Sequence, residues 1–213
     1  GTTLIEQATL LADASDQLGL QNPMVLGQSY GGAVALAWAV ERPDSLSALI
    51  LLAAASNPWT SDLSLFYKIT SSDLGSATVV PALTAFVPNP VVDSAIEGVF
   101  APQKEPEGYA EYIGAPLTLR RDTMRANAMQ RANLLNEIKA LHTRYGAITV
   151  PTEIVHGDAD TTVGLSIHSI PLSQQIKGAT LTVLEGIGHM PHHAAEPDVI
   201  AAIDRAAQRA GLR

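Results

Sequence analysis

A serine flanked by glycines, where an apolar segment gives way to an alanine-rich one, constrains the fold of this chain more than any other feature. The apolar run Met24–Leu26 predicts a short buried β-strand, and Ala33–Arg42 carries strong helix formers as far as Pro43, before which a helix is expected to stop. Ser29 therefore lies on a sharp strand-to-helix turn, in the pattern Gly-x-Ser-x-Gly over residues 27–31. The turn strains the backbone at the serine. We expect both glycines because side chains there would collide with the adjoining strand and helix.

The chemistry that this turn allows depends on two further groups. The turn lifts the hydroxyl of Ser29 clear of the sheet and points the backbone N–H of Tyr30 toward a developing oxyanion. A serine hydroxyl is a weak nucleophile, so it needs a base within hydrogen-bond reach and an acid that orients the base. Asp160 and His189 follow in the chain, and like Ser29 each comes just after a predicted strand. Because parallel α/β sheets place their sites at the carboxyl edge, these three residues are candidates for one catalytic site.

Strands and helices alternate at both ends of the chain. Ala48–Ala53 is apolar on both faces, which is typical of a strand in a parallel sheet covered by helices on both sides. Further strands are predicted at Thr152–His156 and Thr180–Leu184. A capping box at Thr3–Glu6 predicts the start of a helix that Gly19 ends. These patterns predict an α/β fold with a mostly parallel sheet.

Two helices follow the last two predicted strands. Ser166–Ile176 is predicted to be helical as far as Gly178, with a kink or break at Pro171. Pro197–Arg209 predicts an amphipathic helix, whose apolar face comprises Val199, Ile200, Ile203 and Ala207.

Residues 57–147 break this alternation. They hold most of the prolines and no convincing strand apart from a short run at Thr78–Val80. Helices are predicted from Pro90, which suits the start of a helix, and over Asp122–His142. Because long structureless connections are uncommon, we interpret residues 57–147 as a helical cap inserted between two parts of one α/β domain, residues 1–56 and 148–213.

Three motifs resemble those of the α/β-hydrolase superfamily, in its serine-nucleophile branch with a helical cap: Gly27-Gln28-Ser29-Tyr30-Gly31-Gly32, Val155-His156-Gly157-Asp158-Ala159-Asp160 and Gly186-Ile187-Gly188-His189. The resemblance implies Ser29 as nucleophile, Asp160 as acid and His189 as base, in the chain order typical of the superfamily. It implies hydrolysis of carboxylic esters of small or medium apolar acids. Amide, C–C bond and perhydrolase chemistry, or non-catalytic binding of a small ligand, are the alternatives.

Complete members of that superfamily begin with further strands and with a loop, carrying a His-Gly type motif, that supplies a second oxyanion amide. No such segment precedes Ser29 here, so the resemblance implies strands upstream of Gly1. The elbow strand, normally central, is then expected to expose one edge and part of an apolar face, which favours aggregation. These 213 residues alone are accordingly expected to be poorly soluble and nearly inactive.

Several residues compete for the roles of acid and base. Asp158 is the alternative acid, although a turn residue that binds backbone amides is the simpler interpretation, and Asp62 is a more distant candidate. His192 and His193 are close enough to compete for the base, but they are interpreted as a polar loop or the start of the last helix. The remaining histidines are interpreted as a packing residue at a strand end, His156, and as solvated surface residues, His142 and His168.

The predicted cap carries two groups of residues that bear on the substrate. Its aromatic side chains either line a pocket above Ser29 or form the cap's own core: Phe66, Phe86, Phe100 and Tyr109. A basic cluster is interpreted as a solvated helix face rather than a carboxylate clamp: Arg120, Arg121, Arg125 and Arg131.

Composition narrows the classes of partner. The net charge of −8 argues against nucleic acid and against anionic membrane surfaces. The absence of cysteine excludes disulfides, thiolate metal sites and a cysteine nucleophile. The histidines show no metal-ligand spacing, and no apolar run is long enough to span a bilayer. The expected partner is a small, apolar ester substrate, with no metal and no cofactor.

Overall fold

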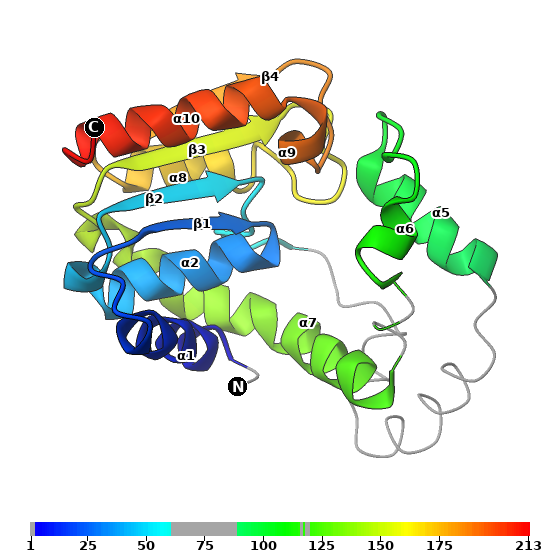
Figure 1. Ribbon diagram of the computed structural model, residues 1–213, viewed down its shortest axis with the longest axis horizontal. Helices are drawn as coiled ribbons and strands as arrows, with labels where there is room; N and C mark the ends of the chain where they lie inside the picture. Colours follow the sequence, from blue (N-terminus) through cyan, green and yellow to red (C-terminus); the bar gives the residue numbers. More distant parts are fainter. Residues whose placement is uncertain (1–2, 61–88, 116, 118–119) are drawn as a thin grey trace.

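The computed structural model describes residues 3–60, 89–115, 117 and 120–213 (Figure 1). Its first elements are α1 (Leu4–Gln17), β1 (Met24–Gln28), α2 (Tyr30–Glu41), a 3-10 turn (Pro43–Ser45), β2 (Ala48–Leu52), α5 (Asn89–Phe100) and α6 (Tyr109–Tyr112). They are followed by α7 (Arg121–Leu141), a 3-10 segment (His142–Ala147), β3 (Thr152–Gly157), α8 (Ser169–Gln175), β4 (Thr180–Leu184), α9 (Pro191–Ala194) and α10 (Glu196–Arg209). No helix in this described part of the chain is both long and apolar enough to cross a membrane.

The four described strands form one parallel sheet in the order β1-β2-β3-β4. The register pairs Gln28 with Leu52, Leu52 with Val155 and Gly157 with Leu184. The carboxyl ends of all four strands therefore meet at one edge of the sheet (Figure 1). The predicted parallel α/β architecture is confirmed, and the predicted strands agree with the observed ones to within one or two residues at each end.

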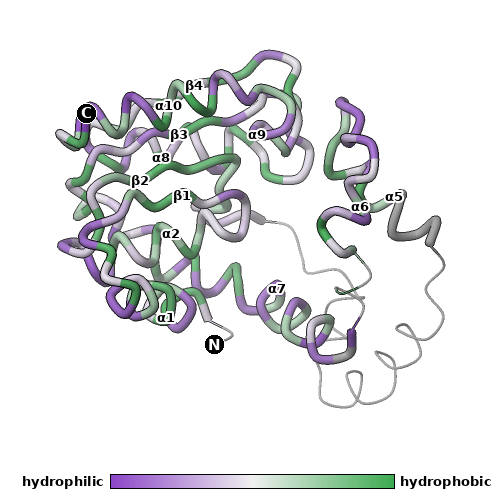
Figure 2. The backbone as a smooth tube through the Cα atoms, viewed as in Figure 1, coloured by the Kyte–Doolittle hydropathy of each residue, from purple (hydrophilic) through white to green (hydrophobic). Residues whose placement is uncertain are grey.

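Helices cover both faces of the sheet, as its apolar strands require (Figure 1). One face packs against α2 and α8, where Leu49, Leu51 and Ile154 join one core cluster. The other face packs against α10, where Ile50 and Val155 join a second cluster. In Figure 2, β2 is hydrophobic along its whole length, whereas α10 alternates between hydrophilic and hydrophobic residues. The sheet is therefore the middle of three layers.

The first helix begins and ends as predicted. The Thr3 hydroxyl accepts from the Glu6 N–H, and the Glu6 carboxylate accepts from the Thr3 N–H. Gly19, at φ +71°, follows the end of α1. The side chain of Gln7 donates a 2.7 Å hydrogen bond to the hydroxyl of Tyr30. This bond ties α1 to the first residue of α2, beside the serine turn.

Strand β1 lies at an edge of the described sheet, and the side chain of Leu26 is 46% exposed. A groove of about 520 Å³ runs along β1, α1 and α2, and its apolar lining includes Leu11, Leu18, Val34 and Trp38. The prediction that this strand exposes an edge and part of an apolar face is confirmed. The interpretation of the strand as buried is wrong at Leu26, because the described elements leave its side chain open to solvent.

Helices α8 and α10 differ from the prediction in detail. Helix α8 begins at Ser169 rather than Ser166, and Pro171 does not break it. Pro171 lies in the first turn, where a backbone N–H has no partner within the helix, so its missing N–H removes no helical bond. In α10 Val199 is buried as predicted, but Ile200 is 48% exposed and lies off the buried face.

The described part of the middle of the chain contains helices and no strand. Helices α5 and α7 match the two predicted helices, and the run at Thr78–Val80 lies outside the described residues. Helix α5 and helix α6 lie beyond the carboxyl edge of the sheet (Figure 1). Gln103, which follows α5, donates to the Gly186 carbonyl at 2.7 Å and accepts from the Gly188 N–H at 2.8 Å. The segment after α5 is thereby attached to the loop that follows β4.

Candidate catalytic site

Ser29 lies on the sharp turn that the sequence predicts. It precedes α2 with φ +52° and ψ −117°, a strained conformation for a residue with a side chain. Its N–H donates to the Leu52 carbonyl at 2.9 Å, and its carbonyl accepts from the Ala55 N–H at 3.1 Å. Both bonds come from β2 and the segment after it, so the neighbouring strand holds the strained backbone in place. Tyr30 is the first residue of α2, so its N–H has no partner within the helix.

The glycines around Ser29 do not all have the predicted role. A Cβ on Gly27 would lie 2.3 Å from the Gly31 carbonyl oxygen, so this glycine is required by close backbone approach, as predicted. A Cβ on Gly31 would meet nothing within 4 Å among the described atoms, so the predicted collision there is wrong. The crowded position is Gly32, where a Cβ would lie 2.4 Å from the Cβ of Ala54. The segment after β2 lies against this first turn of α2 and makes the contact.

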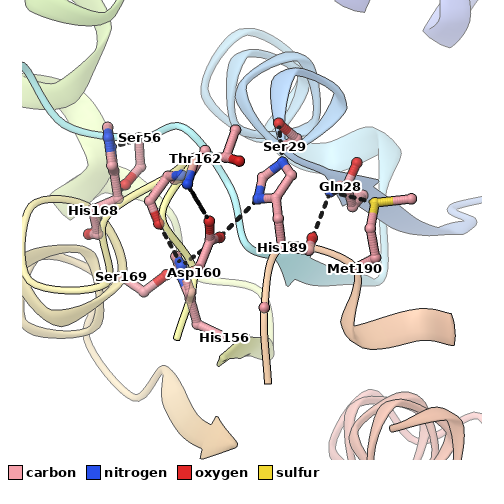
Figure 3. A network of polar contacts seen from close by, with 12 residues as sticks. Gln28, Ser29, Ser56, His156, Asp160, Thr162, His168, Ser169, His189 and Met190 are labelled. Carbon is pink, nitrogen blue, oxygen red and sulfur yellow. Dashed lines mark hydrogen bonds and ion pairs between the residues drawn. The ribbon is translucent and has the colours of Figure 1, made fainter. Parts of the chain in front are cut away.

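The structure brings Ser29, His189 and Asp160 together at the carboxyl edge of the sheet (Figure 3). His189 Nε2 lies 2.9 Å from Ser29 Oγ, and its Nδ1 lies 2.7 Å from Asp160 Oδ2. An ionised carboxylate oxygen only accepts hydrogen bonds, so Nδ1 carries the proton and Nε2 accepts from the serine hydroxyl. His189 is 4% exposed, so this relay is shielded from water.

All acceptor positions of the buried Asp160 carboxylate are filled. Oδ1 accepts from the Thr162 N–H at 2.7 Å and the Val163 N–H at 2.9 Å. Oδ2 accepts from His189 at 2.7 Å and from His156 Nε2 at 3.1 Å. Burial alone would raise the pKa of this carboxyl, but the hydrogen bonds from the two histidines and the Val163 amide outweigh it and hold the pKa below the ordinary aspartate value. Asp160 is therefore ionised at neutral pH.

Asp158, the nearer competing acid, is not in this relay. Asp158 Oδ1 accepts from the Gly186 N–H at 2.7 Å, which is the turn-residue role that its position favours. Asp62 lies outside the described residues. Gly157 allows the β3 and β4 loops to meet, because a Cβ there would lie 2.0 Å from the Ile187 carbonyl oxygen. The absence of a side chain at Gly157 therefore allows the loop that carries His189 to lie close to Asp160.

His192 and His193 lie on α9, and His193 contacts the aromatic residues of α5 and α6. The ring centroids of Phe100, Tyr109 and His193 are 4.8 to 5.5 Å apart. Phe100 is only 2% exposed. Phe100 and Tyr109 therefore pack against α9 instead of lining the cavity at Ser29. Burial, with His193 and His189 nearby, lowers the pKa of His192 to about 4. The other two aromatic candidates lie outside the described residues: Phe66 and Phe86.

His168 is buried, so its interpretation as a solvated surface residue is wrong. Its Nδ1 accepts from the N–H groups of Ser56 and Asn57, each at 3.1 Å. Burial, with His156 nearby, lowers the pKa of His168 to about 4. The ring is therefore neutral at pH 7, with its proton on Nε2. These bonds tie the segment after β2 to the turn before α8.

Two residues contact the proposed relay although the sequence did not predict these contacts. Gln28 donates from Nε2 to the His189 carbonyl at 3.0 Å, so the residue before the serine holds the loop of the histidine. His156 was interpreted as a packing residue, but its ring is bonded to Asp160. His156 lies at the carboxyl end of β3 and Asp160 follows just after it. This short spacing in the sequence could have indicated their contact.

A cavity of about 350 Å³ opens at Ser29 and has a volume within the range of small-molecule sites. Its lining, among the described residues, includes Tyr30, Trp59, Leu134, Thr162, Ile167 and His168. Arg131 also lines it, with Cζ 5.2 Å from the centroid of the Trp59 ring, a cation–π contact. Arg131 is half-buried on α7 and brings a positive charge to the cavity, whereas the interpretation of the basic cluster as a solvated helix face stays a prediction.

Comparisons with known proteins bear on the family and the fold. The sequence profile of the family described as Serine aminopeptidase, S33, matches residues 4–198. The 2-hydroxymuconate semialdehyde hydrolase of Pseudomonas putida is 28% identical over 176 residues, which are 82% of this chain and 58% of that protein. The chain thus spans little more than half the length of this relative.

Similar folds occur among solved structures. An α/β-hydrolase fold protein from Burkholderia ambifaria matches with a TM-score of 0.73 and 23% identity, over 94% of this chain and 72% of that one. The 2-hydroxy-6-oxo-6-phenylhexa-2,4-dienoate hydrolase from Rhodococcus sp. strain RHA1 matches with a TM-score of 0.72 and 16% identity, over 98% and 73% of the two chains. An esterase from Exiguobacterium antarcticum matches with a TM-score of 0.66 and 21% identity, over 97% and 74%. With the family profile spanning residues 4–198, the chain belongs to the serine aminopeptidase S33 family and has the α/β-hydrolase fold.

Proposed function

We propose that this chain carries the site of a serine hydrolase that cleaves small carboxylic esters, with Ser29 as nucleophile, His189 as base and Asp160 as the acid that orients it. One observation supports the proposal above all. The His189 ring bridges Ser29 Oγ at 2.9 Å and Asp160 Oδ2 at 2.7 Å, the two contacts that a base needs. The bridge stands at the mouth of a cavity of about 350 Å³.

The reaction proceeds in two halves. Ser29 Oγ attacks the acyl carbon while its proton passes to His189 Nε2, and the Tyr30 N–H donates to the oxyanion. The C–O bond to the alcohol then breaks, and the alcohol leaves with the proton from His189. Water attacks the acyl-enzyme, His189 takes its proton, and the carboxylic acid departs as the proton returns to Ser29 Oγ. Asp160 stays ionised throughout and stabilises the imidazolium.

A fluorophosphonate probe tests the nucleophile directly. In the full-length protein, we expect stoichiometric labelling of wild type and none of Ser29→Ala, together with a loss of p-nitrophenyl ester hydrolysis of roughly three or more powers of ten. Ser47→Ala is the matched control, since its hydroxyl has no hydrogen-bond partner among the described residues. Retention of more than a few per cent of turnover in Ser29→Ala would exclude the assignment. A chain that binds esters without being labelled would instead be a binding protein.

A second candidate is hydrolysis of a C–C bond in a substrate that carries a carboxylate. The Pseudomonas putida relative acts on an acidic compound, and Arg131 places a cation in the cavity. The two candidates differ in substrate charge as well as in the bond cleaved. Comparing p-nitrophenyl butyrate with mono-p-nitrophenyl succinate tests the charge. Preference for the succinate, lost in Arg131→Gln, supports the carboxylate-bearing substrate that the second candidate requires. Preference for the butyrate, unchanged by Arg131→Gln, supports the apolar ester.

A further inference from the structure

The second histidine on the Asp160 carboxylate lies inside the protein, on the side away from the cavity. His156 is the last residue before Gly157 on β3, and its side chain is fully buried. Its Nε2 lies 3.1 Å from Asp160 Oδ2 and 2.8 Å from the Val163 carbonyl oxygen, and its Nδ1 lies 2.6 Å from Ser169 Oγ. Figure 3 shows Asp160 between this ring and that of His189. Two imidazoles therefore share one carboxylate oxygen.

The proton on this ring follows from its neighbours. Both groups facing His156 Nε2 are oxygens that only accept, so Nε2 carries a proton and donates to them. The hydroxyl of Ser169 supplies the hydrogen bond at Nδ1 that keeps the neutral ring satisfied. His156 is thus a donor to Asp160, held at its far side by the start of α8.

We propose that His156 is a positioning residue for the reaction, and this rests on the proposed function of the site. Its hydrogen bond fixes the rotation of the Asp160 carboxylate so that Oδ2 meets His189 in line. The bond also disperses part of the negative charge on Asp160 Oδ2, which would otherwise stabilise the His189 imidazolium. A carboxylate that also accepts from His156 stabilises the protonated His189 ring less. The ring then returns its proton to the leaving alcohol more readily.

Among the described residues, two further histidines lie close to this cluster. His168, in the turn before α8, faces both His156 and Asp160, and His192 on α9 faces His189 and His193. Burial lowers the pKa of His168 and of His192 to about 4, so both rings are neutral at pH 7. A change in the titration of His189 on substitution of His156 therefore arises at Asp160.

The test compares His156→Leu, which removes the donor but fills the space, with His156→Gln, whose Nε2 can occupy the donor position. His142→Leu, a substitution of a half-buried histidine elsewhere, is the matched control. The titration midpoint of the His189 ring, followed by NMR, should rise by roughly half to one pH unit in His156→Leu and return toward wild type in His156→Gln. On p-nitrophenyl butyrate, kcat should fall roughly 10- to 100-fold in His156→Leu with little change in KM.

The NMR readout does not depend on hydrolysis, so it separates this inference from the proposed function. Absence of labelling and of activity in the full-length wild-type protein would remove the proposed function, while the titration would still decide whether His156 acts on His189. An unchanged midpoint in His156→Leu would overturn the positioning role. If His156→Leu does not fold, His156→Met, which also lacks a donor and has a similar volume, decides in its place: a raised midpoint supports the role, and an unchanged midpoint contradicts it.

Discussion

Acid should destabilise this fold through His168, a histidine outside the proposed relay. Its Nδ1 accepts two backbone N–H groups, a role that only the neutral ring can fill. Its pKa is about 4, against an ordinary value of 6.5, a difference worth about 3 kcal/mol. The unfolded chain takes up the proton below about pH 6.5, whereas the folded chain does not until about pH 4. The free energy of unfolding should therefore fall across this window, by about 2 kcal/mol between pH 7 and pH 5 from this residue.

The variant His168→Asn isolates this contribution, because the asparagine Oδ1 can accept the same two N–H groups but does not titrate. Urea unfolding followed by tryptophan fluorescence, at about pH 7, 6 and 5, measures the free energy of unfolding of both proteins. Wild type should lose about 2 kcal/mol more than His168→Asn on acidification. His192, whose pKa is lowered in the same way, contributes equally to both and cancels. Equal acid losses in the two proteins would refute the assignment of His168 as a buried neutral acceptor.

Two further predictions use matched pairs of neighbouring residues. Asp160→Asn should reduce ester turnover by roughly three to four powers of ten, whereas Asp158→Asn should reduce it less than about tenfold, because only Asp160 faces His189. The reverse ranking, at equal concentrations of folded protein, would transfer the role to Asp158. Gly32→Ala should lower the free energy of unfolding by about 1–3 kcal/mol, since its Cβ would overlap Ala54, whereas Gly31→Ala should change it by less than about 1 kcal/mol. Equal thermal shifts for these two variants would show that the crowding lies elsewhere.

The elements that could be predicted are those whose signals are local. The capping box at Thr3, the helix that stops before Pro43 and the uninterrupted apolar run at Ala48 each depend on neighbours within a few residues, and each agrees with the structure. Helix α8 was placed too early because the residues from Ser166 have no local signal that opposes a helix. The first turn instead forms around Pro171, whose ring is compatible with that position.

Side-chain environments were harder to predict because they depend on contacts between distant segments. His168 was interpreted as exposed, yet its ring is buried against Ser56 and Asn57, which are more than a hundred residues away in the chain. The same dependence on distant contacts explains why the crowded glycine near Ser29 was not predicted correctly. The pattern around Ser29 indicates that close approach occurs, but the need for Gly32 arises from Ala54, after the next strand. A local motif therefore indicates that backbone segments approach closely near Ser29, but it does not indicate which glycine the approach requires.

The position of His189 depends on three parts of the fold that no single motif contains. Gln28, beside the serine, bonds its carbonyl, and Gln103, after α5, bonds the backbone of the same loop on both sides of Ile187. Gly157 lets that loop approach β3, where any side chain would collide with the Ile187 carbonyl. The 2.9 Å and 2.7 Å contacts of the ring are thus set by the elbow strand, the segment between α5 and α6, and the end of β3 together. A displacement of the segment after α5 would move His189 relative to Ser29, which couples the helices over the sheet edge to the geometry of the proposed relay.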